Sequence, residues 1–157
     1  MRIGFGNDIH RLTAGRPLII GGVRIESDLG PEGHSDADVL LHAITDAVLG
    51  ALALGDIGTH FPNSEPEWKD AESSVFLARA AELANERGYS VTNIDSTVSL
   101  ESPKLRPHID EMRGRIAELL GVDIGRVSVK AKTGEGVDAV GRREAIRAEA
   151  VVLLERG

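Results

Sequence analysis

A short motif near the start of the chain, Asp8-Ile9-His10, has residue types that bind metal ions. If residues 2–12 form a strand, Asp8 and His10 point to the same side, because strand side chains alternate between faces. His42 follows in an apolar run with helical spacing, Val39 to Leu54. Two histidines and one carboxylate are the ligand set of an open catalytic zinc site. We therefore treat the three residues as candidate ligands, although lone histidines are more often structural.

Two aspartates flank His42 at helical spacing. Asp38 and Asp46 lie four residues before and after it, so one helix face carries all three side chains. A metal-bound histidine usually donates its other ring N–H to an acceptor, and either carboxylate could orient His42 in this way. A solvent-exposed polar face explains the two aspartates equally well. The sequence from Ser35 to Asp38 resembles a capping box, with Ser35 as the predicted N-cap.

Three loops carry further polar groups. Asp56 lies between glycines, where a carboxylate can accept hydrogen bonds from ligand hydroxyls or simply stabilise a turn. Lys132 and Thr133 open a glycine-rich loop and could contact phosphate, while Glu135 could bind a hard cation such as Mg²⁺. Residues 102–107 form a stiff, basic loop. Loops at strand ends often hold ligands, but each of these is also consistent with an ordinary turn.

Alternating strands and helices must position these groups. The hydrophobic pattern predicts strands at 2–12, 17–26, 89–101, 126–132 and 143–155, and helices at 38–54, 73–87 and 108–120. The segments between them, chiefly 28–37, 55–72 and 134–141, are predicted loops, the second of them mobile. This order predicts one domain over residues 1–157 of the α/β (α+β) class, a two-layer sandwich whose single mixed sheet is covered by helices on one face.

Composition narrows the functional class. The chain has 157 residues with 41% hydrophobic and only 3% aromatic residues, so we expect an aliphatic core. A net charge of −7 argues against a nucleic-acid binder, which needs a basic face. The absence of cysteine excludes disulfides and thiolate zinc sites. No apolar run approaches the roughly 20 residues of a membrane span, and no leader precedes the first strand, so we expect a cytoplasmic protein that uses no membrane.

Taken together, the motifs resemble one family, the 2-C-methyl-D-erythritol 2,4-cyclodiphosphate synthases. The likeness covers nearly the whole chain, and the combined motif is highly specific although no fragment of it is. The matching segments are Asp8-x-His10, Ile20-Gly-Gly-Val23, His34-Ser-Asp-x-Asp38 through His42 to Asp46, Leu54-Gly-Asp-Ile-Gly58 with Phe61-Pro62, Pro103-Lys104, Pro107-His108-Ile109, Met112-Arg113, Lys130-Ala131, Thr133, Glu135 and Gly141-Arg142.

The resemblance implies an enzyme of non-mevalonate isoprenoid precursor biosynthesis. Its substrate would be 4-diphosphocytidyl-2-C-methyl-D-erythritol 2-phosphate. The 2-phosphate attacks the β-phosphorus of the same molecule and CMP leaves, which is the reaction of a cyclising phosphorus–oxygen lyase. The resemblance also implies Zn²⁺ on Asp8, His10 and His42, and Mg²⁺ or Mn²⁺ on Glu135, bridging the substrate diphosphate.

The resemblance further implies roles for individual residues. His34 and Thr133 match transition-state stabilisers of the family. Ser35 would lie near the 2-phosphate, and residues 100–106 would wrap the cytosine. The full set of positions expected to contact a substrate or ligand is Ser35, Asp56, Gly58, Phe61, Glu65, Leu100, Pro103, Lys104, Leu105, Arg106, Ala131, Lys132, Ala139 and Arg142.

Members of the family are homotrimers, so the resemblance implies active sites between subunits and sheets that line the trimer interior. A central cavity would hold an isoprenoid diphosphate, with Arg142 at its mouth and Glu149 as a partner position. Asn7 and Ala139 depart from the usual residues of that cavity.

Two other functions are alternatives to the synthase. A metal phosphohydrolase would need a further carboxylate and histidine cluster, which is not obvious here. A non-catalytic trimeric module that binds isoprenoid diphosphates would have no use for the intact metal set.

Overall fold

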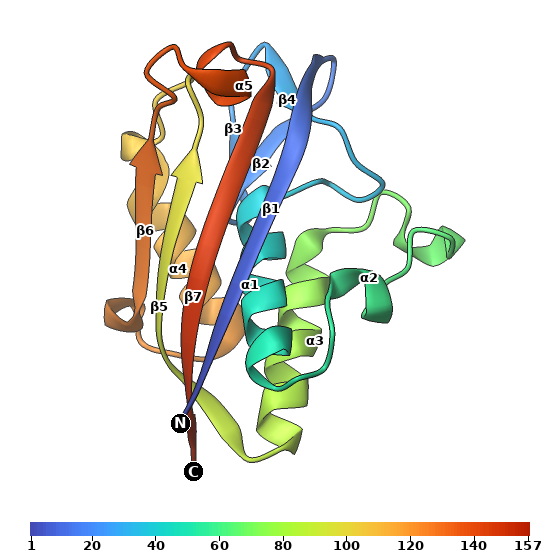
Figure 1. Cartoon of the computed structure of the whole chain (residues 1–157), viewed down its shortest axis with the longest axis vertical. Helices are drawn as coiled ribbons and strands as arrows, with labels where there is room; N and C mark the ends of the chain where they lie inside the picture. The colour runs from blue at the N-terminus through green and yellow to red at the C-terminus, as the bar shows by residue number, and fades with distance from the viewer.

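The chain folds into two layers, a mixed β-sheet and helices packed on one of its faces (Figure 1). The computed structural model describes residues 1–157. The strand order is β4-β1-β7-β5-β6, and only β5 and β6 run parallel. These strands are β1 (Arg2–Ala14), β4 (Leu29–Pro31), β5 (Tyr89–Ser99), β6 (Val127–Lys132) and β7 (Ala145–Arg156). The predicted two-layer fold is therefore confirmed.

The helix layer consists of α1 (Val39–Ala51), α3 (Ser73–Glu86) and α4 (Ile109–Leu120). Helix α1 lies at the centre of the core, because it packs on β1 and β7 with one side and on α3 with another. Of its 13 residues, 11 are buried, which explains why its sequence is apolar on nearly every side. The longest helix, α3, has 14 residues. No helix of the chain is both long enough and apolar enough to span a membrane.

Two glycines of β1 determine how closely α1 approaches the sheet. A Cβ atom at Gly4 would lie 1.8 Å from the carbonyl oxygen of Ala47, and one at Gly6 would lie 2.0 Å from that of Ala43. No side chain fits in either place. Because strand residues alternate between faces, the side chains of Asp8 and His10 follow on this same helix-facing side. The close contact thus brings them to the N-terminal end of α1.

The short elements were not predicted. The expected strand over 17–26 is a hairpin of β2 (Leu18–Ile20) and β3 (Val23–Ile25), which turns at two glycines with positive φ, Gly21 and Gly22. The expected loops contain β4, α2 (Ile57–His60), α5 (Asp138–Gly141) and the 3₁₀ turn η1 (Pro66–Trp68). Two further 3₁₀ turns, η2 (Arg106–His108) and η3 (Ile124–Arg126), precede α4 and β6. Elements of three or four residues are too short to produce a hydrophobic period.

The N-cap of α1 is Asp38, so the prediction of Ser35 was wrong. The Asp38 side chain accepts a hydrogen bond from Leu41 N at 3.0 Å. Ser35 Oγ instead accepts from Ala37 N at 3.1 Å, within a turn that precedes the helix. Ala37 has a φ of +56°, and the helix begins only after this left-handed residue.

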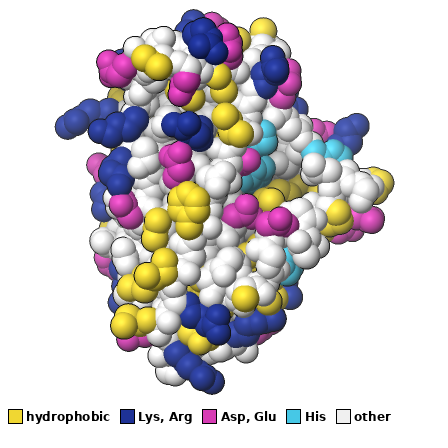
Figure 2. Space-filling view, in the orientation of Figure 1, with side chains coloured by type: hydrophobic (Ala, Val, Ile, Leu, Met, Phe, Trp, Pro, Cys, Tyr) yellow, Lys and Arg dark blue, Asp and Glu magenta, His cyan; other side chains and the backbone are white.

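The other face of the sheet carries no helices. Four large apolar side chains on it, Ile3, Phe5, Ile9 and Val151, are between 44% and 73% exposed. Figure 2 shows hydrophobic side chains spread along this face among charged ones. An exposed apolar strip of this kind, interrupted at Asn7, is typical of a surface that another protein chain covers.

Candidate active site

The structure brings the three predicted metal ligands together. Asp8 Oδ2 lies 2.8 Å from His10 Nε2 and 2.9 Å from His42 Nδ1, and the two histidine nitrogens are 3.4 Å apart. The ligand atoms all lie within 4.8 Å of one another, and no other group of histidines and carboxylates in the chain comes together in this way. β1 supplies two ligands and α1 the third, so the site depends on the packing of these two elements.

The cluster has the electrostatics of a cation site. Burial by itself would raise the pKa of the Asp8 carboxyl, but hydrogen bonds from His10 and His42 outweigh it and lower the pKa to about 2. Burial disfavours the charged form of His10, yet the hydrogen bond to Asp8 and the charge of Asp8 raise the pKa of His10 overall. Asp8 is therefore an anion at neutral pH, and it attracts either protons on the imidazoles or a metal ion.

The second ring nitrogen of His42 faces two hydroxyl groups. His42 Nε2 lies 2.8 Å from Ser73 Oγ and 3.3 Å from Ser35 Oγ. Ser73 is the first residue of α3 and is fully buried. Ser73 was not predicted, because it is 31 residues from His42 and belongs to no local motif.

Asp38 and Asp46 have other partners than His42. The buried Asp38 carboxylate accepts hydrogen bonds from Gly21 N, Gly22 N and Leu41 N, at 2.9, 2.7 and 3.0 Å, and so fastens the β2–β3 hairpin to α1. Burial raises its pKa to about 6. Asp46 accepts from Ile57 N at 2.7 Å and fastens α2 to α1; burial also raises its pKa. Neither aspartate belongs to a solvent-exposed polar face, and neither orients His42 through a hydrogen bond.

The cluster opens into a pocket of about 370 Å³. Its wall contains the three candidate ligands and nine further residues: Gly33, His34, Ser35, Ile57, Gly58, Phe61, Asn63, Trp68 and Phe76. Three aromatic rings form one side of it. The Phe61 ring lies 4.5 Å from that of Phe76 and 5.2 Å from that of Trp68. These contacts anchor the segment 55–72, which the sequence predicts as a loop without a period.

The side chain of His34 has an unused hydrogen-bonding atom that faces no protein partner. Its Nε2 is buried and makes no hydrogen bond within the chain, which costs folding free energy unless a ligand supplies the partner. Asp56 caps the short α2, since its carboxylate accepts from Thr59 N and Thr59 Oγ1; the hydroxyl contact contributes most to lowering its pKa. Asp56 and the exposed Glu65 lie outside the pocket wall.

A second group of predicted residues gathers where β5 and β6 end. Leu100, Lys104, Leu105, Arg106, Ala131, Lys132 and Thr133 surround a hollow of about 120 Å³, and Pro103 lies in the same loop. Thr133 Oγ1 donates to Glu135 Oε1 at 2.7 Å. Gly134 N donates to Glu101 Oε2 at 2.7 Å, which ties the loop after β6 to the loop after β5.

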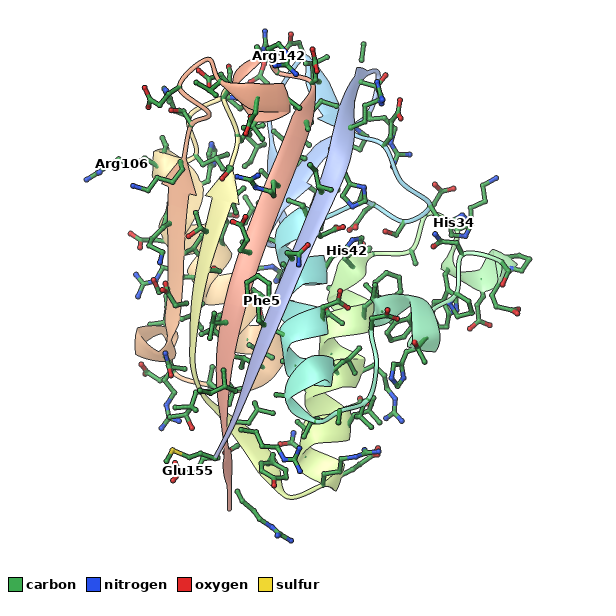
Figure 3. All side chains as sticks on the ribbon, viewed as in Figure 1. Phe5, His34, His42, Arg106, Arg142 and Glu155 are labelled. Atoms are coloured by element: carbon green, nitrogen blue, oxygen red, sulfur yellow. The ribbon has the colours of Figure 1, made fainter.

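The pocket around the metal cluster and the group of residues at the ends of β5 and β6 lie far apart within one chain. β7 and β5 separate β1 from β6, and three strand spacings amount to about 14 Å. Figure 3 shows His34 and His42 on one side of the molecule and Arg106 at the opposite edge of the sheet. A single chain therefore does not bring the metal cluster and the Thr133–Glu135 loop into one site.

Ala139 lies on α5 (Asp138–Gly141), and Arg142 is the residue that follows this helix. Arg142 Nε pairs with Glu144 Oε1 at 3.0 Å, whereas Glu149 pairs with Arg147. Within the chain, each of these two residues therefore pairs with a near neighbour in the sequence. Ala139 is half-buried.

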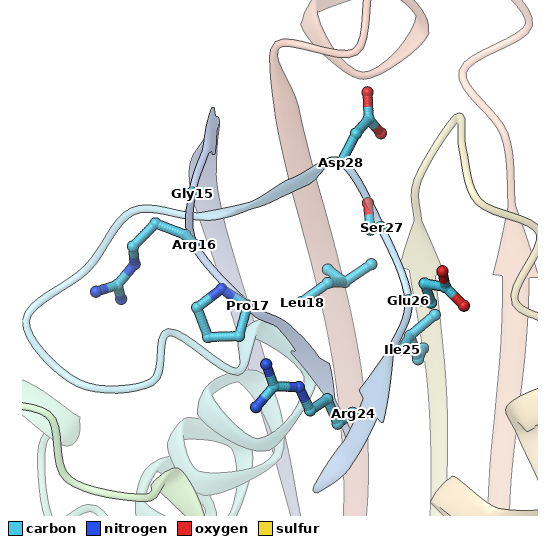
Figure 4. Close-up of a pocket in the computed structure, with 9 residues that line it drawn as sticks. All are labelled: Gly15, Arg16, Pro17, Leu18, Arg24, Ile25, Glu26, Ser27 and Asp28. Atoms are coloured by element: carbon cyan, nitrogen blue, oxygen red, sulfur yellow. The ribbon is translucent and has the colours of Figure 1, made fainter.

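A larger hollow than the one at the metal cluster, about 560 Å³, lies elsewhere in the molecule. It lies beside the β2–β3 hairpin and has no histidine in its wall (Figure 4). Arg16 borders this hollow and donates to the carbonyl oxygens of Pro31, Gly33 and Ser35 at 3.1, 3.4 and 3.0 Å. This arginine therefore braces the loop that carries His34.

Four pocket residues were not predicted: Gly33, Ile57, Trp68 and Phe76. A compositional signal for part of this set does exist. The chain has only three Phe, one Trp and one Tyr, and three of these five aromatics fall between residues 61 and 76. Scarce aromatic residues concentrated in one polar segment indicate a locally packed wall.

Comparisons with known proteins agree on one family. The model of the YgbB family matches residues 1–155. The 2-C-methyl-D-erythritol 2,4-cyclodiphosphate synthase of Salinibacter ruber is 56% identical over 155 residues, 99% of each chain. The enzyme of the same name from Thermosynechococcus vestitus is 57% identical over 157 residues, 100% of this chain and 98% of that one. A solved structure of such a synthase, described as the CDP-bound form, has a TM-score of 0.91 and 41% identity, and covers 98% of this chain and 100% of that chain.

Proposed function

The chain belongs to the YgbB family of 2-C-methyl-D-erythritol 2,4-cyclodiphosphate synthases, and we propose that its Asp8, His10 and His42 cluster is the metal centre at which the cyclic diphosphate is closed. It is an enzyme of the non-mevalonate route to isoprenoid precursors. The 2-phosphate of the cytidyl substrate attacks the β-phosphorus of the same molecule. A new P–O bond forms, the P–O bond to CMP breaks, and CMP leaves with the bonding electrons. We class the reaction as that of a cyclising phosphorus–oxygen lyase.

The observation that carries this proposal is the convergence of two imidazoles and one carboxylate in the wall of a pocket. Three protein ligands without thiolate suit Zn²⁺ and leave a position open for substrate. When bound there, the ion polarises a phosphate oxygen and orients the substrate. The unpartnered, buried Nε2 of His34 fits a second contact to the same ligand.

The chain's own groups then position the substrate. We assign to His34 and Ser35 the phosphate nearest the metal, and to Asp56 and Gly58 the erythritol hydroxyls. The aromatic wall that includes Phe61 restricts access of water, which would otherwise compete with the 2-phosphate as nucleophile. Neither His34 nor Ser35 acts as a nucleophile, because the attacking oxygen belongs to the substrate.

The second group of residues would hold the nucleotide end. We assign Thr133 and Lys132 to the diphosphate. Glu135 would hold a Mg²⁺ or Mn²⁺ ion, which would neutralise phosphate charge. The hollow formed by residues 100–106 and 131–133 would take the cytosine. The CDP-bound form of a similar synthase supports nucleotide binding by this fold.

The separation of these two groups supports a site shared by two subunits. We propose a homotrimer in which the metal cluster of one chain faces the Thr133–Glu135 loop of its neighbour. The exposed apolar strip of Ile3, Phe5, Ile9 and Val151 would then be covered in the trimer interior. Isoprenoid diphosphate binding in a central cavity and a cytoplasmic location stay predictions. Asn7 lies opposite Glu149 on β7 in the strand register, which makes this part of the open face polar.

A direct test of the reaction uses the purified protein, the cytidyl substrate and Mg²⁺, with products followed by phosphorus NMR. CMP together with a cyclic diphosphate is the expected result. CMP with an acyclic product would identify a phosphohydrolase. Zinc binding without turnover would identify a binding module instead.

A second test addresses the shared site. His42→Ala and Glu135→Ala should each be inactive alone. Random mixed trimers from co-expression should regain about a quarter of the wild-type activity, because one site in four then combines two intact halves. If each site lay within one chain, mixing would restore nothing.

A further inference from the structure

The loop of residues 32–38, between β4 and α1, carries His34 and has no regular secondary structure. Its position therefore depends on the hydrogen bonds that its backbone groups make. On one side the segment before α3 holds it, because Asp70 N donates to His34 O at 2.8 Å and Asp36 N donates to Ala71 O at 3.0 Å. The carbonyl groups before and after His34 are left to a partner on the other side.

Arg16 is the partner of these carbonyl groups. Its Nε donates to Pro31 O at 3.1 Å, and its Nη2 donates to Ser35 O at 3.0 Å and to Gly33 O at 3.4 Å. The three acceptors belong to every second residue, so one side chain holds the backbone from the end of β4 to Ser35. A guanidinium suits this task, because its N–H donors form a rigid, planar fork. Figure 4 shows the Arg16 side chain within the bend of this loop.

The same loop lies against the metal cluster. A Cβ atom at Gly33 would lie 3.4 Å from His10 Cε1, and Ser35 Oγ lies 3.3 Å from His42 Nε2. Arg16 itself is not part of the wall of the metal pocket. The arginine is therefore placed to act on that pocket through the loop and not by touching its contents.

We propose that Arg16 is a positioning residue that holds His34 and Ser35 against the metal cluster, where both contact the substrate phosphate. The inference rests on the proposed function, which assigns this phosphate to the two side chains. The buried Nε2 of His34, which has no partner in the chain, is the atom whose position matters most. Loss of the guanidinium would leave three carbonyl groups without their donor and let the loop shift.

Steady-state kinetics of the zinc-loaded enzyme test this role. Arg16→Ala should lower kcat about 10–100-fold and change KM little, because a misplacement of about 1 Å near the reacting groups has an effect of this size. Zinc affinity should stay at the wild-type value, since the three candidate ligands lie on β1 and α1. Arg16→Lys should fall between the alanine variant and the wild type, because an ammonium group lacks the planar fork. It carries the same measurements if Arg16→Ala does not fold.

Arg24→Ala is the matched control. Arg24 is an exposed arginine in the wall of the same hollow, and the carbonyl groups of the loop are bonded to Arg16 instead. Its loss removes the same charge from the same hollow and should change neither kcat nor KM.

A double-mutant cycle separates positioning from a general loss of stability. If Arg16 acts through His34, Arg16→Ala should lower kcat only about threefold or less in a His34→Ala background, because the two effects are then not additive. A purely structural effect would lower kcat by the same factor in both backgrounds.

A readout without turnover keeps the two proposals apart. The NMR signals of the His34 ring, identified among those of the five histidines by their loss in His34→Ala, should shift in Arg16→Ala and not in Arg24→Ala. Wild-type kcat in folded Arg16→Ala, equal losses in both backgrounds, or unshifted His34 signals would overturn the role of Arg16. A wild type that does not cyclise the substrate, with His34 signals that shift in Arg16→Ala, would instead overturn the proposed function and leave the support of the loop intact.

Discussion

Replacing Gly6 by alanine should damage the metal centre without touching a ligand. The new Cβ would lie 2.0 Å from the carbonyl oxygen of Ala43 and 2.7 Å from Ala47 N, whereas ordinary contact begins at 3.4 Å. Helix α1 must therefore withdraw from β1 by about 1.4 Å. His42 moves with the helix, while Asp8 and His10 stay on the strand. Metal–ligand distances tolerate only about 0.2 Å, so the cluster can no longer close around an ion.

We expect Gly6→Ala to lose about 1–3 kcal/mol in the free energy of unfolding, the usual cost of overpacking a core. Zinc affinity should fall by about 100-fold or more, because the ligand shell is misplaced by over an ångström. Chemical denaturation and zinc competition with a chelator measure the two effects.

Gly114→Ala on α4 is the control. Its Cβ meets no atom within 4 Å, and it should gain up to about 1 kcal/mol from helix propensity. Wild-type zinc affinity in a folded Gly6→Ala protein would refute the reasoning.

Three further outcomes follow from the same contacts. His42→Ala should abolish zinc binding and activity, as judged by metal content and turnover, yet keep the fold and the sedimentation coefficient of the wild type. Unchanged zinc content would contradict the ligand assignment. Asp38→Asn should lower the free energy of unfolding in urea by about 1–3 kcal/mol, because one of the three backbone N–H donors then faces an amide N–H. An unchanged free energy of unfolding would show that these hydrogen bonds contribute little to stability. In the metal-free protein, ionised Asp8 stabilises the fold above its unfolded pKa of 3.8, and this contribution is lost as pH falls through about 2. The raised pKa of His10 adds stability that is present below 6.5 and lost as pH rises through its folded pKa. Asp8→Asn should reduce the dependence of the thermal unfolding midpoint on pH in both ranges, the acidic one and the one in which His10 loses its proton. An unchanged pH dependence would assign it to other groups.

The long elements could be predicted from the sequence because each buries one face or stripe and so leaves a period in the residues. β1, α1, α3, α4, β5, β6 and β7 all begin and end within a few residues of the predicted bounds. The hairpin at residues 18–25 and the turns within 55–72 could not be predicted in this way, because side chains far away in the sequence hold them in place. Asp38 binds the hairpin through Gly21 and Gly22, and Asp46 binds α2 through Ile57.

The same difference separates the predicted from the unpredicted parts of the site. Asp8 and His10 share a face because of strand alternation, a property of local geometry. Residue types and spacing also made His42 and the loop residues candidates, and the family resemblance gave each of them a specific role. The sequence alone therefore determined the residue types available for a metal and the class of reaction. Only the tertiary structure decided that Gly4 and Gly6 admit α1 to the strand, that His42 is supported by Ser73 and not by Asp38 or Asp46, and that the Thr133–Glu135 loop lies across the sheet. These are contacts between segments far apart in the chain, and their partners are selected by packing, which no local pattern records.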